Sequence, residues 1–120
     1  MTSVMIVDDD KDIRMLVRAL LRHANSGVDV ASETASGEEA LAHIDELDPG
    51  VVVLDQMMPG MSGLETARRM LAHRPEQRII LFSACMTEQL CREARALGVT
   101  KCLSKERVAA IAAAIAAVAC

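Results

Sequence analysis

A run of four aliphatic residues that ends in an aspartate is the feature that most constrains the fold of this chain. Residues 51–54 read Val-Val-Val-Leu, and Asp55 follows directly. Such an uninterrupted apolar run predicts a short strand buried on both faces, as in parallel sheets. Pro59, Gly60 and Gly63 then predict a loop. Ligands of open α/β sheets bind at the carboxyl ends of the strands, so Asp55 is placed for chemistry, with a simple strand-end cap as the alternative interpretation.

Similar apolar runs recur along the chain and alternate with helical patterns. We expect strands at residues 4–7, 28–34, 51–54, 78–82 and 99–103, with the more polar second strand near a sheet edge. The first helical pattern has apolar residues at positions 13, 16, 17, 20 and 21, and it has arginines on the opposite face at positions 14, 18 and 22. The last helix is expected from about residue 106. Strict alternation predicts a single α/β domain over residues 1–120, with a parallel sheet covered by helices on both faces.

Capping residues indicate several helix boundaries. Ser62 and Glu65 have the spacing of a capping box, in which each side chain binds a free backbone N–H group of the other residue. Thr87 is expected to cap the fourth helix, with Gly98 at its carboxyl end. Residues 25–27, Asn-Ser-Gly, are expected to end the first helix.

Composition and charge exclude several classes of protein. The 120 residues are 52% hydrophobic and 25% charged, which indicates a globular domain, and Phe82 is the only aromatic residue. A net charge of −4 argues against nucleic acid as a direct partner, and no apolar run is long enough to cross a membrane. Since the first residues lack the features of a signal peptide, we expect a cytoplasmic protein whose four cysteines are reduced thiols: Cys85, Cys91, Cys102 and Cys120.

Polar residues collect where the expected strands end. Asp8 and Asp9 follow the first strand, Asp55 the third, Ser83 the fourth and Lys105 the fifth. Because the carboxyl ends of parallel strands meet at one edge of a sheet, we expect these side chains to converge. Clustered carboxylates repel one another, and oxygen ligands favour Mg²⁺ or a similar hard cation such as Mn²⁺. With a lysine and a hydroxyl opposite the cation, the group predicts a cradle for a phosphoryl group, which Asp55 could carry as the nucleophile.

In this order and spacing, these residues resemble the receiver domain of two-component response regulators over essentially the whole chain. The matching motifs are Asp8-Asp9, Asp55 with the loop of residues 58–63, Ser83-Ala84 and Lys105. The resemblance implies a flavodoxin-like, doubly wound (βα)5 fold with strand order 2-1-3-4-5. It also implies a signalling domain and not an enzyme, phosphorylated on Asp55 by a sensor histidine kinase or a phosphotransfer protein.

The resemblance further implies a role for each residue of the site. Asp8 and Asp9 would hold Mg²⁺, Asp9 more directly, together with Asp55 and the backbone carbonyl of Met57. Lys105 would pair with the phosphoryl oxygens.

The residues after the fourth strand are assigned in the same way. Ser83 would turn toward the phosphoryl group once it is present, and Ala84 is small, as the family requires beside the reacting phosphorus. Met57 and Cys85 occupy positions that tune how fast water removes the phosphoryl group in the family.

Four positions depart from the family pattern. Glu106 follows the lysine where proline is usual, which questions the usual geometry of that loop. Cys102 stands where the family has Tyr or Phe, and cysteine is too short for the inward movement of an aromatic ring that relays activation. Gln56 replaces an aliphatic residue, and Ser62 replaces an aspartate, although either residue caps a helix well.

Three other functions also use aspartates or this fold. A calcium loop starting at Asp8 fails, because Ile13 stands where a glycine is needed. A phosphohydrolase of the haloacid dehalogenase type would use Asp8 as nucleophile and Asp10 as acid and base, but the chain has no room for that family's cap domain. A pseudo-receiver, which binds proteins without being phosphorylated, is favoured by Cys102 and Glu106 and opposed by the intact acidic cluster.

The carboxyl-terminal segment has an unusual composition. After residue 107 there is no charged residue, and the outward positions of the expected last helix are almost all alanine. Alanine is the best helix former, which is one explanation. Alternatively this helix packs on a second copy of the chain or on an output domain, as the surface of helix 4, strand 5 and helix 5 often does in the family. The end at Cys120 is also what a domain of a longer regulator would show.

Overall fold

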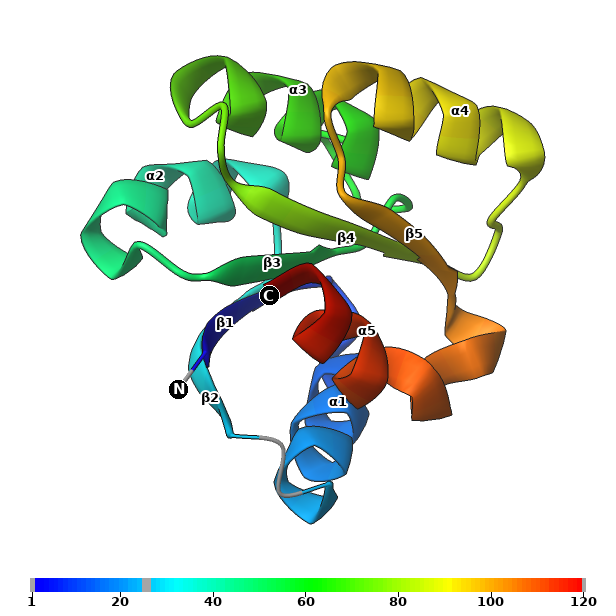
Figure 1. Ribbon diagram of the computed structural model, residues 1–120. Coiled ribbons are helices and arrows are strands. Elements are labelled where there is room, and N and C mark those ends of the chain that lie inside the picture. The colour runs from blue at the N-terminus through cyan, green and yellow to red at the C-terminus, as the bar shows by residue number, and fades with distance from the viewer. Residues whose placement is uncertain (1, 25–26, 120) are drawn as a thin grey trace.

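A five-stranded parallel sheet lies between two layers of helices in the computed structural model, which describes residues 2–24 and 27–119 (Figure 1). The strands are β1 (Thr2–Val7), β2 (Val28–Thr34), β3 (Val51–Leu54), β4 (Arg78–Ser83) and β5 (Lys101–Ser104). Their order is β2-β1-β3-β4-β5, and all four pairings are parallel. The flavodoxin-like fold and the edge position of β2 are therefore confirmed.

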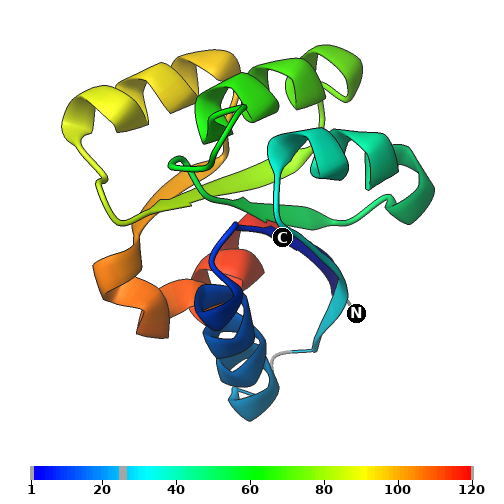
Figure 2. The ribbon, with the colours of Figure 1, turned by 180° about the vertical axis from the view of Figure 1, so that it is seen from behind.

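The helices cover the sheet in two unequal groups. They are α1 (Lys11–His23), α2 (Gly37–Leu47), α3 (Gly63–His73), α4 (Glu88–Leu97), the 3-10 helix η1 (Lys105–Ala110) and α5 (Ile111–Ala119). Helices α2, α3 and α4 lie on one face of the sheet, and α1 and α5 lie on the other (Figures 1 and 2). The apolar residues accordingly form two cores, one on each face, and Phe82 belongs to the α1 and α5 side.

Several boundaries differ from the predicted ones, and two differences concern the carboxyl-terminal part of the chain. Strand β5 begins at Lys101, two residues after the expected start, and the last helix is divided into η1 and α5. Within η1 the backbone of Arg107 departs from helical values, with φ −103° and ψ 33°, so the segment is kinked there. Helix α1 ends at His23, and of the predicted turn at residues 25–27 only Gly27, with φ 70°, lies within the described part of the chain.

The predicted caps are largely confirmed. Oγ of Ser62 accepts a hydrogen bond from the backbone N–H of Glu65 at 3.2 Å, and Oγ1 of Thr87 accepts one from Leu90 at 3.0 Å. Gly98 ends α4 in the left-handed conformation, with φ 106°. The carboxylate of Glu65 binds two arginines of its own helix, so only the first half of the expected capping box forms.

The pairing of β1 with β2 contains one irregularity. Val4 pairs with Val30, but the next residue, Met5, pairs with Ser32, so Ala31 is an extra residue in β2. Among the described residues, no helix combines the length and the hydrophobicity of a membrane-spanning segment.

Candidate functional site

Three carboxylates meet at the carboxyl edge of the sheet. Asp8 and Asp9 follow β1, and Asp55 follows the neighbouring strand β3, where its N–H group donates to the carbonyl of Val7 at 2.9 Å. One carboxylate oxygen from each aspartate lies within 4.8 Å of the other two. The side chains of Asp8 and Asp55 are buried, whereas Asp9 is exposed. Sheet pairing thus brings together residues that are 47 positions apart in the chain.

Lys105 supplies a positive charge to this cluster. Its Nζ atom lies 2.8 Å from Oδ2 of Asp8 and 3.2 Å from Oδ1 of Asp55. The same ammonium lies 6.0 Å from the centre of the Phe82 ring, within the range of a cation–π contact. Lys105 is the first residue after β5 and reaches the pocket although Glu106, and not proline, follows it.

Burial and neighbouring charges shift the pKa values of Asp55 and Lys105. Burial, followed by the nearby charge of Asp8, raises the pKa of Asp55 above its usual value, and Lys105 opposes this shift only in part. Burial disfavours the ammonium of Lys105, but the two carboxylates outweigh that effect and raise its pKa. The lysine is therefore charged at neutral pH, while the Asp55 carboxylate sits in an environment that favours added positive charge.

The donor set fits a hard divalent cation. Oδ2 of Asp8 and Oδ1 of Asp55 are buried and, among the described residues, accept no hydrogen bond of normal geometry. Three carboxylates without a histidine or cysteine ligand match the oxygen preference of Mg²⁺ and Mn²⁺. Asp9, on the solvent side, leaves a way in for the ion and its waters.

The other expected site residues lie at or just after the ends of β3 and β4. Ser83 is fully buried at the end of β4, and its Oγ atom accepts the N–H group of Cys85 at 3.2 Å. Ala84 and Cys85 are exposed. The backbone of Met57 favours the charged form of Asp55 and so opposes the rise of its pKa, and the side chain of Met57 is 64% exposed.

Cys102 lies away from the carboxylates, on β5 and beneath α4. Its Sγ atom is 3.9 Å from the carbonyl oxygen of Cys91 in α4, and it packs against the core on that face. Burial, together with the Cys91 thiol, raises the pKa of Cys102 to about 12. The thiol is therefore protonated at neutral pH and acts as a small, half-buried group.

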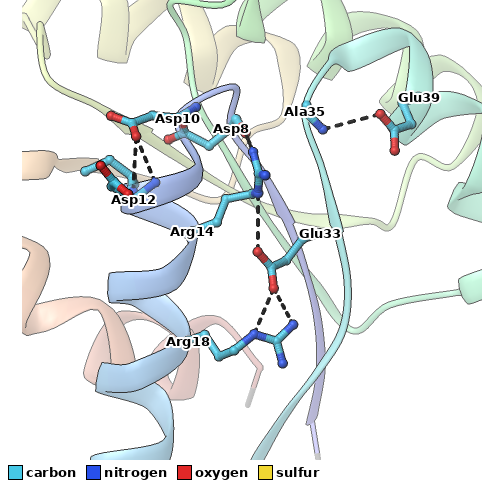
Figure 3. Close-up of polar contacts among 9 residues, drawn as sticks. Asp8, Asp10, Asp12, Arg14, Arg18, Glu33, Ala35 and Glu39 are labelled. Atoms are coloured by element: carbon cyan, nitrogen blue, oxygen red, sulfur yellow. Dashed lines mark hydrogen bonds and ion pairs between the residues drawn. The ribbon is translucent and has the colours of Figure 1, made fainter.

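Three residues that shape the site were not recognised from the sequence as parts of it. A Cβ atom on Gly63 would lie 2.3 Å from the carbonyl oxygen of Asp55, so only glycine allows α3 to approach this strand end. Oε1 of Gln56 accepts the N–H group of Leu64 at 2.8 Å and so caps α3. Arg14 contacts the backbone of Asp8 (Figure 3). Gly63 and Gln56 stood out only as a loop glycine and a departure from a pattern, and neither signal predicts these contacts.

Comparison with known proteins agrees with this geometry. The sequence matches the profile of the family described as "Response regulator receiver domain" over residues 4–116. It is 39% identical over 109 residues to the transcriptional activator protein ExaE of Pseudomonas putida, an alignment that covers 91% of this chain and 50% of ExaE. It is 36% identical over 85 residues to response regulator GacA of Pseudomonas syringae pv. syringae, with 71% of this chain and 39% of GacA covered. The chain thus spans half or less of these two relatives.

Solved structures agree as well. The signal receiver domain of the response regulator NarL from Mycobacterium tuberculosis superposes with a TM-score of 0.90 and 28% sequence identity, over 98% of this chain and 95% of that one. A doubly wound parallel sheet with carboxylates and a lysine at its carboxyl edge places the chain among the open α/β domains that bind ligands at the ends of their strands. Within this class, the chain belongs to the response regulator receiver domain family.

Proposed function

We propose that residues 1–120 form one receiver domain, which accepts a phosphoryl group on Asp55 from a sensor histidine kinase or a phosphotransfer protein in a reaction that requires Mg²⁺ or Mn²⁺. The observation that carries the proposal is the position of Asp55, buried beside Asp8 and within 3.2 Å of the Lys105 ammonium. The site supports the function of a signalling domain, and not that of an enzyme with its own substrate.

Each side chain has a role in the transfer. An oxygen of Asp55 attacks phosphorus as the bond from phosphorus to the histidine nitrogen breaks, and the leaving imidazole keeps the electron pair. Lys105 binds a phosphoryl oxygen and offsets the charge that collects there. Asp8, Asp9 and the Met57 carbonyl would hold the cation with Asp55. When bound, the cation supplies positive charge to the carboxylates and the phosphoryl oxygens.

Residues at the rim would adjust the lifetime of the phosphoryl group. Ser83 would leave the N–H group of Cys85 and donate its hydroxyl proton to a phosphoryl oxygen. Ala84, with its single methyl group, leaves room for the incoming phosphorus. Met57 and Cys85 are both exposed beside the pocket, so their side chains are placed to control the approach of water.

Phosphorylation would change how the domain binds its partners. The new group carries about −1.5 to −2 charges, enough to shift a balance between two conformations. Cys102 is packed under α4 and has no ring to move inward, so we propose that β5 and α4 shift as a unit instead. The surface of α4, β5 and α5 would then receive a second copy or an output domain. A cytoplasmic location follows from the proposed exchange with a histidine kinase.

The test is intact-mass measurement after incubation with MgCl2 and a small phosphodonor such as acetyl phosphate. We expect one phosphoryl adduct on the wild-type chain, and none with EDTA or on Asp55→Asn. A matched control is Asp45→Asn, on the outer face of α2, which should be labelled as the wild type is. Labelling that survives Asp55→Asn but is lost in Asp8→Asn would support a phosphohydrolase-type nucleophile. Mg²⁺ binding without any adduct would support the pseudo-receiver.

A further inference from the structure

A half-buried arginine connects α1 to the backbone of the acidic cluster. Nη1 of Arg14 donates a hydrogen bond to the carbonyl oxygen of Asp8 at 2.5 Å. The Arg14 side chain is only 16% exposed, so most of it has left solvent to make this contact. The carbonyl belongs to the peptide group between Asp8 and Asp9. The guanidinium therefore fixes the orientation of the peptide that joins two of the three carboxylates.

The arginine is itself held by the edge strand. Nε of Arg14 lies 3.3 Å from Oε1 of Glu33 in β2, and Oε2 of the same carboxylate accepts hydrogen bonds from Nε and Nη2 of Arg18 (Figure 3). Both oxygens of Glu33 are thus engaged by arginines from α1. With its partner fixed on both sides, Arg14 has little freedom to leave the Asp8 carbonyl.

The remaining backbone contacts of this loop are also fixed. The N–H group of Asp8 donates to the carbonyl of Thr34, which follows Glu33 in β2, at 3.1 Å. The N–H group of Asp10 donates to Oδ1 of Asp8 at 2.9 Å, and Oδ1 of Asp10 caps α1 by accepting the N–H group of Asp12 at 2.9 Å. Between these points, Arg14 supplies the bond to the carbonyl of Asp8.

We propose that Arg14, anchored by Glu33, is a positioning residue for the cation site: it holds the Asp8–Asp9 peptide in the orientation that aims both carboxylates at Mg²⁺. This inference rests on the proposed function, because it assigns a supporting group to the same pocket. Groups that orient the ligands of a metal typically contribute about tenfold to a hundredfold in metal affinity.

If Arg14 acted only through its charge, its replacement would change the Mg²⁺ affinity in the opposite direction. A positive guanidinium near the pocket repels a cation, so its removal would strengthen Mg²⁺ binding if charge were its only effect. If Arg14 positions the loop, its removal weakens Mg²⁺ binding despite the lost repulsion. The direction of the change therefore distinguishes the two roles.

The experiment measures Mg²⁺ affinity by isothermal titration calorimetry with MgCl2 alone, for the wild type and four variants. Arg14→Gln should raise the dissociation constant about tenfold. Arg14→Lys keeps the charge but loses the planar fork, so it should remain weakened, and Glu33→Gln should show a smaller loss in the same direction. Arg22→Gln removes an equal charge from an exposed position of the same helix and leaves both the Asp8 contact and the Glu33 anchor intact, so it should stay within about twofold of the wild type.

A second measurement uses the protein without metal. Amide hydrogen exchange at Asp8 and Asp10 should accelerate in Arg14→Gln and not in Arg22→Gln, while the thermal unfolding midpoints show whether both variants are folded. An unchanged or tighter Mg²⁺ dissociation constant in a folded Arg14→Gln, or full recovery of affinity in Arg14→Lys, would overturn the proposal. A wild-type chain that binds Mg²⁺ but takes no phosphoryl group would contradict the proposed function and leave this inference standing.

Discussion

The ammonium of Lys105 lies 2.8 Å from Oδ2 of Asp8, although the strands that precede these two residues are separated in the sheet by β3 and β4. The pair spans the pocket, with Asp55 beside it. A lysine from the last strand thus offsets the charge of carboxylates that follow the first and third strands. This relationship makes the charge balance of the pocket depend on one side chain.

Replacement of the lysine should destabilise the domain. In Lys105→Met two buried carboxylates face each other without a positive charge, and we expect a loss of about 3 kcal/mol in the free energy of unfolding at pH 7. Because protonation of the carboxylates removes the repulsion, the loss should shrink as the pH is lowered. MgCl2 should restore more stability to Lys105→Met than to the wild type. Urea denaturation with MgCl2 or EDTA at several pH values measures both effects, and a loss that neither pH nor Mg²⁺ changes would contradict this account.

The raised pKa of Asp55 predicts a pH dependence of stability. The folded state holds this proton more tightly than the unfolded state, so stability falls as the pH rises from the unfolded value of 3.8 through the raised folded value. In EDTA, Asp55→Asn should therefore be more stable than the wild type above that window, and the difference should disappear below it. Thermal unfolding midpoints from acid to neutral pH test this, with Asp9→Asn, at an exposed position, as the comparison. A difference that is independent of pH would count against the shift.

Gly63 should tolerate no side chain. The Cβ atom of an alanine would lie 2.3 Å from the Asp55 carbonyl oxygen and 2.8 Å from Cα of Gln56, so α3 must move away from the strand end. We expect Gly63→Ala to cost about 2 kcal/mol of stability, as overpacked sites do, and to slow labelling of Asp55. At Gly50 the nearest atom to an added Cβ is 3.4 Å away, so Gly50→Ala should change stability by less than about 0.5 kcal/mol. Equal effects of the two alanines in urea denaturation would show that the close approach is relieved easily.

The side-chain cap on α3 should be measurable. Gln56→Leu restores the aliphatic residue that is usual after the phosphorylated aspartate in the family but leaves the N–H group of Leu64 without its acceptor at 2.8 Å. We expect a loss of about 1 kcal/mol. Gln56→Glu keeps an acceptor oxygen at the helix amino terminus and should retain more of the stability, as judged by urea denaturation. A Leu variant as stable as the wild type would show that water replaces the amide.

Much of the fold follows from local patterns in the sequence. The apolar runs before Asp8 and Asp55 predicted buried parallel strands, and parallel pairing alone requires that residues after those strands meet at one edge. The caps at Ser62 and Thr87 were also predictable, because each hydrogen bond joins residues only three positions apart in the chain. These features depend on neighbours in the chain.

Features that depend on tertiary contacts were not predictable. Arg14 was assigned to the polar face of its helix, whereas in the structure it is half-buried and lies between Glu33 and the Asp8 carbonyl. That contact requires the position of β2 relative to α1, which no helical pattern encodes. The break at Arg107 likewise interrupts a segment whose composition favours a continuous helix.

The extra residue in β2 changes which face of the sheet the side chains after it point to. Residues paired across neighbouring strands face the same side of a sheet, and Glu33 is paired with Ile6, which faces the α1 and α5 layer. In an uninterrupted register Glu33 would pair with Val7 and face the opposite layer, away from Arg14. One inserted residue, Ala31, thus decides which helical layer receives the carboxylate. A β2 strand without Ala31 would leave every strand and helix in place. It would nevertheless turn Glu33 away from Arg14, so the connection between the edge strand and the acidic cluster would be lost.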